Sequence, residues 1–273
     1  MEQKGRLHLI RHPESSLNLA FRELRETGRV PKTAVLDEVA GLTCNGVVQA
    51  ISKANEIAEV EQHTPAGKVL LLTSDILRAV IMATLVEERL NRSRHPDEHV
   101  QVYKLPELRE RAQGLLCLGV GARFPELEAR IIGVHGLEQK GARRLVYEQP
   151  ISEPTPREME IAAELGRFAR VDIQGESSID MIPRIQEMGR IVEWLFAQGY
   201  TDIYAITHYH YIWATRMGLL GITPEELVVM MDQEKKTGAT LGNVSETIYE
   251  WTPDNGWELP EENWNIPLRR CIN

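Results

Sequence analysis

The sequence predicts an α/β fold, specifically a three-layer αβα sandwich with a mostly parallel central sheet. Short apolar runs typical of β-strands occur at residues 6–11, 68–73, 100–104 and 202–207. Longer segments with helical periodicity alternate with them, at residues 16–25, 45–60, 76–90, 156–168, 178–196 and 211–220. Because strands that alternate with helices form βαβ units, their strands are expected to run parallel.

The chain of 273 residues is expected to fold as a single domain, 1–273, with no linker between two cores. The segment 114–156 is rich in glycine and proline, which indicates an insertion or lid over the sheet. The Trp-rich tail at 251–273 is expected to contain a final strand and an irregular covering segment. Its tryptophans are expected to be packing anchors rather than ligand contacts.

The composition limits the classes of partner. The net charge of -9 argues against nucleic acid or an anionic membrane surface as a partner, and no run approaches the ~20 apolar residues of a membrane span. The three cysteines have no spacing typical of a zinc site or a disulfide framework. We expect a cytoplasmic protein with no cofactor and no resident metal; the oligomeric state stays open.

The carboxyl ends of the predicted strands carry the chemically informative residues. Ligands of open α/β sheets bind just beyond these ends. The residues there are Arg11 and His12 after the first strand, Ser74 and Arg78 after the second, Glu107 and Glu110 after the edge strand, and His208 after the last.

This set of residue types suits phosphoryl transfer through a covalent intermediate. Arginine forks bind phosphate oxygens in a bidentate way and meet the negative charge of the transferring group. A neutral imidazole attacks phosphorus, a second, protonated imidazole donates to the phosphate oxygens, and a carboxylic acid protonates the leaving oxygen. The substrate is therefore expected to be a small phosphorylated molecule.

Seven blocks, in order from residue 7 to about 250, resemble motifs of the histidine phosphatase (phosphoglycerate mutase-like) superfamily. The first is an apolar strand followed by Arg11, His12, Pro13, Glu14 and Ser15, with Asn18 shortly after. The others are Leu42-Thr43 with Gly46 and Gln49-Ala50, Ser74-Asp75 with Arg78-Ala79, Leu108 and Glu110 with Gly114, Gly175-Glu176-Ser177 with Arg184, Thr207-His208, and Gly242-Asn243 with Ser245. Together they cover nearly the whole chain.

The resemblance implies a phosphoglycerate mutase-like fold and a role for each matching residue. His12 matches the nucleophile, and Glu110, in preference to Glu107, matches the acid/base. The implied phosphate ligands are Arg11, Arg78 and His208, with Asn18 and, more weakly, Ser15 as supporting contacts.

The chain departs from the family pattern next to both histidines. Pro13 and Tyr209 stand where the family has glycine, and proline lacks the N–H that glycine would offer to phosphate. Tyr209 and His210 are therefore candidates for setting substrate specificity, together with Arg143 and Arg144, which are similar to the mutase arginine pair.

Three alternatives to the phosphatase branch stay open. The first is a mutase, which returns the phosphoryl group to another hydroxyl of its substrate. The second is a relative that binds phosphorylated ligands without turnover, which Pro13 and Tyr209 motivate. The third is a metal site at His208 and His210, because a His-x-His pair offers two imidazoles to one ion.

Overall fold

The computed structural model describes residues 4–27, 40–63, 67–92, 94–111, 176, 178–237 and 241–266. The chain divides into two compact units. The first comprises Met1–Ser15, Gly41–Glu110 and Ile182–Asn273, and the second comprises Ser16–Ala40 and Arg111–Met181. The second unit contains helix α1 (Ser16–Thr27).

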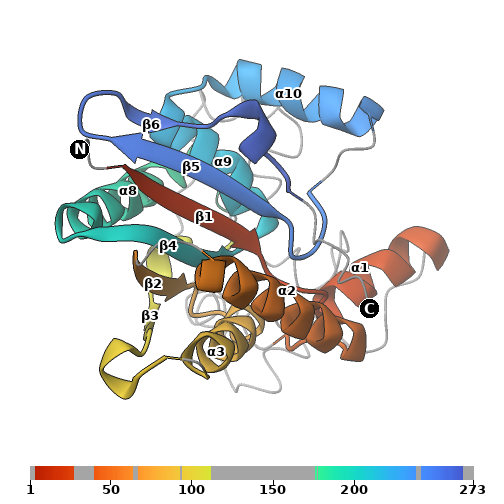
Figure 1. Cartoon of the computed structure of the whole chain (residues 1–273). Helices are drawn as coiled ribbons and strands as arrows, with labels where there is room; N and C mark the ends of the chain where they lie inside the picture. Colours follow the sequence, from red (N-terminus) through yellow and green to blue (C-terminus); the bar gives the residue numbers. More distant parts are fainter. Residues whose placement is uncertain are drawn as a thin grey trace, which may run out of the picture. The chain divides into compact units, whose positions relative to one another are not determined.

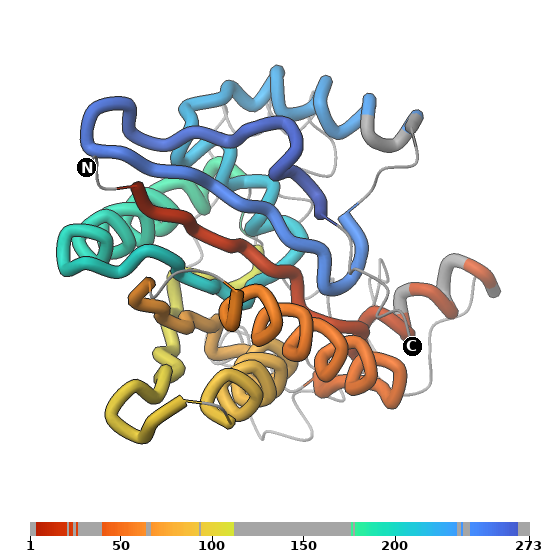
Figure 2. The backbone as a smooth tube through the Cα atoms, in the orientation of Figure 1, coloured from red at the N-terminus to blue at the C-terminus, as the bar shows by residue number. Residues whose placement is uncertain are grey.

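A mixed six-stranded sheet in the order β3-β2-β4-β1-β5-β6 forms the centre of the first unit (Figure 1). The strands are β1 (Gly5–Arg11), β2 (Lys68–Thr73), β3 (Val102–Lys104), β4 (Tyr200–Thr207), β5 (Glu246–Thr252) and β6 (Gly256–Glu258). The first four pair in parallel, and β5 and β6 are antiparallel additions at one edge. The backbone trace shows β1 and β4, far apart in the sequence, lying side by side (Figure 2).

Helices cover both faces of this sheet, which gives the three layers that the sequence predicts (Figure 1). One face carries α2 (Cys44–His63) and α3 (Leu77–Asn91), and the other carries α8 (Ile182–Ala197) and α9 (Tyr209–Leu220). Helix α10 (Pro224–Thr237) packs against α9. Short 3-10 turns occur at η2 (Pro96–Glu98), η3 (Pro106–Leu108) and η5 (Glu261–Asn263).

The core explains why the parallel strands are almost continuously apolar. Side chains of a strand alternate between faces, and both faces of this sheet are covered. Ile10, Leu71 and Ile206 pack with α2 and α3 in one buried cluster. Their neighbours Leu9 and Ala205 are also completely buried. No described helix is long and apolar enough to cross a membrane.

The α/β fold is confirmed. Helix α10, which is polar, was not predicted. The predicted final strand corresponds to two strands, β5, which begins before residue 251, and β6 within the tail. The predicted insertion at 114–156 and the predicted helix at 156–168 lie outside the described residues. Within the described part of the tail, the tryptophans are packing anchors as predicted: Trp251 and Trp257 pack on Phe196, and Trp264 packs on Trp213.

Candidate active site

His12 lies directly beyond the carboxyl end of β1, with 3% of its surface exposed. Its Nδ1 lies 2.7 Å from the carbonyl oxygen of Pro13, and its Nε2 accepts a hydrogen bond from Nε of Arg78 at 3.0 Å. A carbonyl only accepts and an arginine only donates, so these contacts require the neutral tautomer with the proton on Nδ1. The lone pair of His12 is therefore on Nε2.

Arg78 joins the two candidate histidines. Its Nη2 donates to Nδ1 of His208 at 3.1 Å, and Nε2 of His208 lies 2.9 Å from Oγ of Ser74. The rings of His12 and His208 lie 5.1 Å apart, centroid to centroid. Side chains from the ends of β1, β2 and β4 thus meet around one buried guanidinium.

Burial and positive charge keep both histidines neutral. Burial lowers the pKa of His12 well below its ordinary value, and the charges of Arg78 and Arg11 lower it further. Burial and Arg78 likewise lower the pKa of His208, although Glu110 opposes them. In this arrangement Nδ1 of His208 accepts from an arginine and carries no proton, so a protonated His208 stays a prediction for the phosphate-bound state.

Arg11 ends β1 next to His12. Its Nη1 donates to the carbonyl oxygen of Leu241 at 2.6 Å, and its guanidinium lies 5.0 Å from the centre of the Tyr209 ring. The backbone of Arg11 is held by the predicted Gly-Asn-x-Ser block, through bonds to Val244 and Ser245. Tyr209 therefore lies against Arg11, and its role in substrate specificity stays a prediction.

Glu110 lies against the first turn of α9. The predicted helix begins at residue 211, whereas α9 begins at Tyr209. The backbone N–H of His210 therefore belongs to the first turn, where N–H groups have no acceptor within the helix. This N–H lies 3.2 Å from Oε1 of Glu110 and 3.4 Å from Oε2. Arg184 of α8 fixes the loop that carries Glu110 by donating to the carbonyl oxygens of Glu107, Arg109 and Glu110.

Several positioning contacts explain motif residues to which the sequence assigned no role. The backbone N–H of Glu14 donates to the side chain of Gln49, and Thr43 donates to the Glu14 carboxylate. A Cβ atom on Gly46 would lie 1.9 Å from the carbonyl oxygen of Glu14, so the close approach of α2 requires glycine there. The Leu-Thr-x-x-Gly-x-x-Gln block thus holds the segment after the candidate nucleophile.

Asp75 has a similar positioning role. It forms an ion pair with Arg109, which ties the end of β2 to the loop of Glu110. The N-cap of α3 is Ile76, whose own side chain makes no capping hydrogen bond. Ser74 accepts from the backbone N–H of Ile76 and lies against His208.

The structure brings Arg11, His12, Arg78 and His208 together. The other predicted ligands stay predictions: Ser15 is buried and bridges to Leu42 through its backbone, and Asn18 lies on α1 in the second unit. Arg143 and Arg144 lie outside the described residues.

The rings of His208 and His210 face different partners, Arg78 with Ser74 for the first and Glu110 for the second. Within the described ranges, no three His, Cys, Asp or Glu side chains form a metal-binding group.

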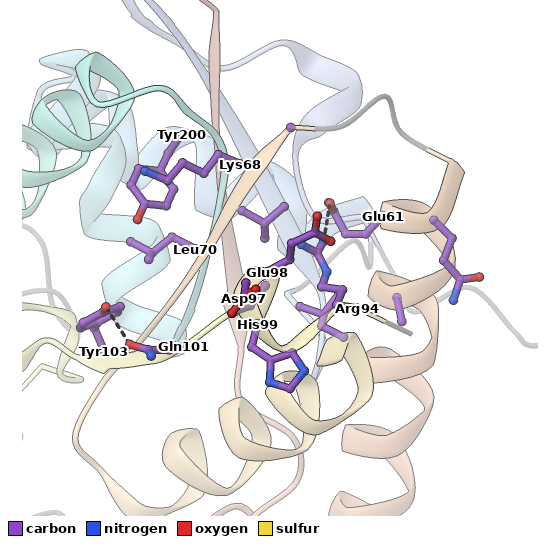
Figure 3. Close-up of a pocket in the computed structure, with 16 residues that line it drawn as sticks. Glu61, Lys68, Leu70, Arg94, Asp97, Glu98, His99, Gln101, Tyr103 and Tyr200 are labelled. Carbon is purple, nitrogen blue, oxygen red and sulfur yellow. Dashed lines mark hydrogen bonds and ion pairs between the residues drawn. The ribbon is translucent and has the colours of Figure 1, made fainter. Parts of the chain in front are cut away.

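A separate cavity of about 670 Å³ lies at the opposite, amino end of the strands (Figure 3). Its wall includes Lys68 and Tyr200, the first residues of β2 and β4, and the ammonium of Lys68 lies 4.0 Å from the centre of the Tyr200 ring. Arg94 and Glu61 face each other in it at 3.8 Å. Its charges are mixed, and it contains none of the predicted catalytic residues.

Comparisons with known proteins agree with this architecture. No family model and no curated protein matches the sequence. Among solved structures, a mycobacterial glucosyl-3-phosphoglycerate phosphatase in complex with VO3 superposes with a TM-score of 0.58 at 20% identity, over 96% of this chain and 100% of that one.

Two further solved structures superpose over similar lengths. Phosphoglycerate mutase from Bacillus anthracis gives a TM-score of 0.55 at 16% identity, over 95% of this chain and 92% of that one. A phosphoserine phosphatase mutant from Entamoeba histolytica with phosphoserine gives 0.51 at 16% identity, over 96% and 98%. The chain therefore has the phosphoglycerate mutase-like α/β fold that these phosphatases and the mutase share.

Proposed function

We propose that this chain is a member of the histidine phosphatase superfamily and hydrolyses a small phosphate monoester through a phosphohistidine on His12. The observation that carries the proposal is the state of His12: a buried, neutral imidazole whose lone pair is on Nε2, facing Arg78. The lowered pKa of His12 keeps this lone pair available at neutral pH.

In the first half-reaction, the Nε2 lone pair of His12 attacks phosphorus and forms the N–P bond. The P–O bond to the leaving group breaks, and the leaving oxygen takes a proton from Glu110. In the second half-reaction, water attacks the phosphoryl group and gives a proton to Glu110. The N–P bond then breaks, and its electron pair returns to Nε2.

The cations supply the electrostatic part of catalysis. In this structure, Nε of Arg78 donates to the lone pair that must attack, so a bound substrate has to draw this guanidinium onto its phosphate oxygens. Arg11 and Arg78 then meet the negative charge of the transferring group. The negative charge of a bound phosphoryl group also favours a proton on His208. It raises the pKa of His208 and so opposes the arginines, which lower it.

A mutase is the second candidate, because the solved structures with this fold include a phosphoglycerate mutase as well as phosphatases. The two activities differ only in the acceptor of the phosphoryl group. A mutase returns it to a second hydroxyl of the same molecule and releases no inorganic phosphate.

A phosphate-release assay over sugar phosphates, nucleotides and phosphoamino acids, with and without chelator, tests this proposal. We expect hydrolysis of at least one substrate, insensitivity to chelator, and a loss of at least about 10³-fold in His12→Ala. Isomerisation of phosphoglycerate without phosphate release would identify the mutase instead. Binding of phosphate esters without turnover of any of them would contradict catalysis.

A further inference from the structure

His210 contacts the proposed acid/base twice. Besides its backbone N–H, the imidazole Nδ1 lies 3.4 Å from Oε1 of Glu110, an ion-pair distance. Both side chains are largely buried, at 18% exposed for His210 and 9% for Glu110. An imidazole this close to a carboxylate in a poorly hydrated place interacts with it strongly.

Other charged groups lie near this contact. His208, two residues before His210, accepts from Arg78 in this structure. Arg184 donates to backbone carbonyl oxygens of the loop. The chain neighbours of the two residues include Tyr209, which lies beside Arg11, Tyr211, which lies beside Arg184, and Glu107, Arg109 and Arg111 around Glu110.

The ring of Tyr209 lies beside the imidazole of His210. The two rings lie 5.1 Å apart and nearly perpendicular, at 86°. The first turn of α9 therefore presents an aromatic ring toward Arg11 and an imidazole toward Glu110. Tyr209 stands where the family has the glycine that follows the second histidine, and His210 comes next.

We propose that His210 is a positioning residue for the acid/base: its imidazolium stabilises the carboxylate that Glu110 becomes when it gives its proton to the leaving oxygen. The inference rests on the proposed function and deepens it. During the first half-reaction, the proton moves from Glu110 to the leaving oxygen, and the new carboxylate forms an ion pair with His210. During the second, Glu110 takes a proton from water while His210 keeps its own.

This role depends on the leaving group. The oxygen of 4-nitrophenolate leaves without much help from an acid, whereas an alkoxide needs a proton. Loss of His210 therefore affects an alkyl phosphate more than an aryl phosphate. The parameter to measure is kcat/KM, which reports the phosphorylation step even where hydrolysis of the phosphoenzyme limits kcat.

The test compares His210→Gln and His210→Asn with the wild type on glycerol 2-phosphate and 4-nitrophenyl phosphate. We expect kcat/KM for glycerol 2-phosphate to fall about tenfold, part of the ~10²–10⁴-fold that an acid/base contributes, and the aryl substrate to change about threefold or less. The basic limb of the pH profile moves upward by about one unit, since a neighbouring positive charge is lost. Two variants with side chains of different length are used, so that the test still stands if one of them does not fold.

Glu110→Gln and the double variant Glu110→Gln/His210→Gln provide the internal comparison. Glu110→Gln shows the same preference for the aryl substrate, and adding His210→Gln has little further effect, because the two residues act as a unit. His99→Gln, an exposed histidine far along the chain, is the matched control and changes neither substrate.

Equal losses on both substrates with an unmoved pH profile in the His210 variants would overturn this inference while Glu110→Gln still supports the proposed function. A wild type with no phosphatase activity would overturn both.

Discussion

His8 and His12 are two buried histidines of one strand, one within β1 and one just beyond its end, and their pKa values shift in opposite directions. Burial lowers the pKa of both. At His8, hydrogen bonds from Nε2 to Asp202 and from Nδ1 to Glu246 outweigh burial and raise the pKa. At His12, Arg78 adds to burial and lowers it well below the ordinary value.

The difference shows that the sign of the neighbouring charge, rather than burial, decides the state of each ring. His8 is a cation within a buried ionic network, in which Lys53 also contacts Glu246 at 2.6 Å and Arg6 contacts Asp202 at 2.6 Å. Burial would raise the pKa of Glu246, but His8 and Lys53 lower it to about 2. The same strand therefore carries a structural cation and, just beyond its end, a neutral imidazole.

The largest expected effect on folding follows from removing the structural cation. His8→Leu leaves Asp202 and Glu246 buried without it, so we expect a loss of about 3–5 kcal/mol in the free energy of unfolding at pH 7. Urea denaturation measures this, with the exposed His95→Leu as the control. A loss below about 1 kcal/mol would mean that the network does not depend on His8.

The next effect concerns the guanidinium between the two candidate histidines. Arg78→Ala is expected to lower kcat/KM by about 10²–10³-fold, as expected for the loss of a donor to transition-state charge. It also raises the pKa of His12 toward its ordinary value, which an NMR titration of the ring measures. Arg190→Ala on α8, an exposed arginine paired with Glu187, is the control. A His12 pKa unmoved in Arg78→Ala would contradict the electrostatic account.

A smaller effect appears in the pH dependence of stability. The folded-state pKa of His12 is lowered, so below the ordinary pKa of about 6.5 the unfolded state binds a proton that the native state does not. Relative to wild type, His12→Gln is therefore expected to gain about 1.4 kcal/mol per pH unit as the pH falls from 6.5 toward 5.

The contribution of His8 has the opposite sign. Because its pKa is raised, its contribution is complete below 6.5 and is lost as the pH rises through the raised value. Urea denaturation between pH 5 and 8 measures the contributions of His8 and His12 to the free energy of unfolding. Parallel pH curves for wild type and His12→Gln would show that His12 is not held neutral.

The smallest effect is expected at Tyr209. Tyr209→Ala removes the contact with Arg11, worth about 0.5–1 kcal/mol for a cation–π pair, so KM is expected to rise about two- to fivefold with little change in kcat. Steady-state kinetics on 4-nitrophenyl phosphate measure it. A large fall in kcat with KM unchanged would instead place Tyr209 in the chemical step.

The sequence predicted the fold because alternating strand and helix patterns leave few arrangements for a parallel sheet. It also predicted that Arg11, His12, Arg78 and His208 meet, because the carboxyl ends of parallel strands share one edge. Their protonation states were not predictable, since these depend on which neighbour donates to which ring nitrogen.

The contacts that position the candidate site residues could not be predicted from the sequence either. The donation from Arg184 to three carbonyl oxygens and the ion pair of Asp75 with Arg109 join segments whose spacing in the sequence carries no signal. Helix α9 begins two residues earlier than its periodicity indicated, which placed His210 beside Glu110. A histidine two residues after the second candidate histidine was the available signal for that contact.

The most direct test of the account is the chemical identity of the phosphoenzyme. Rapid quenching of the enzyme with a substrate, under alkaline conditions, followed by peptide mass spectrometry and 31P NMR, locates the phosphoryl group. We predict phosphohistidine at His12 bonded through Nε2, and none in His12→Ala. Phosphate on Nδ1 of His12, or on another residue, would contradict it.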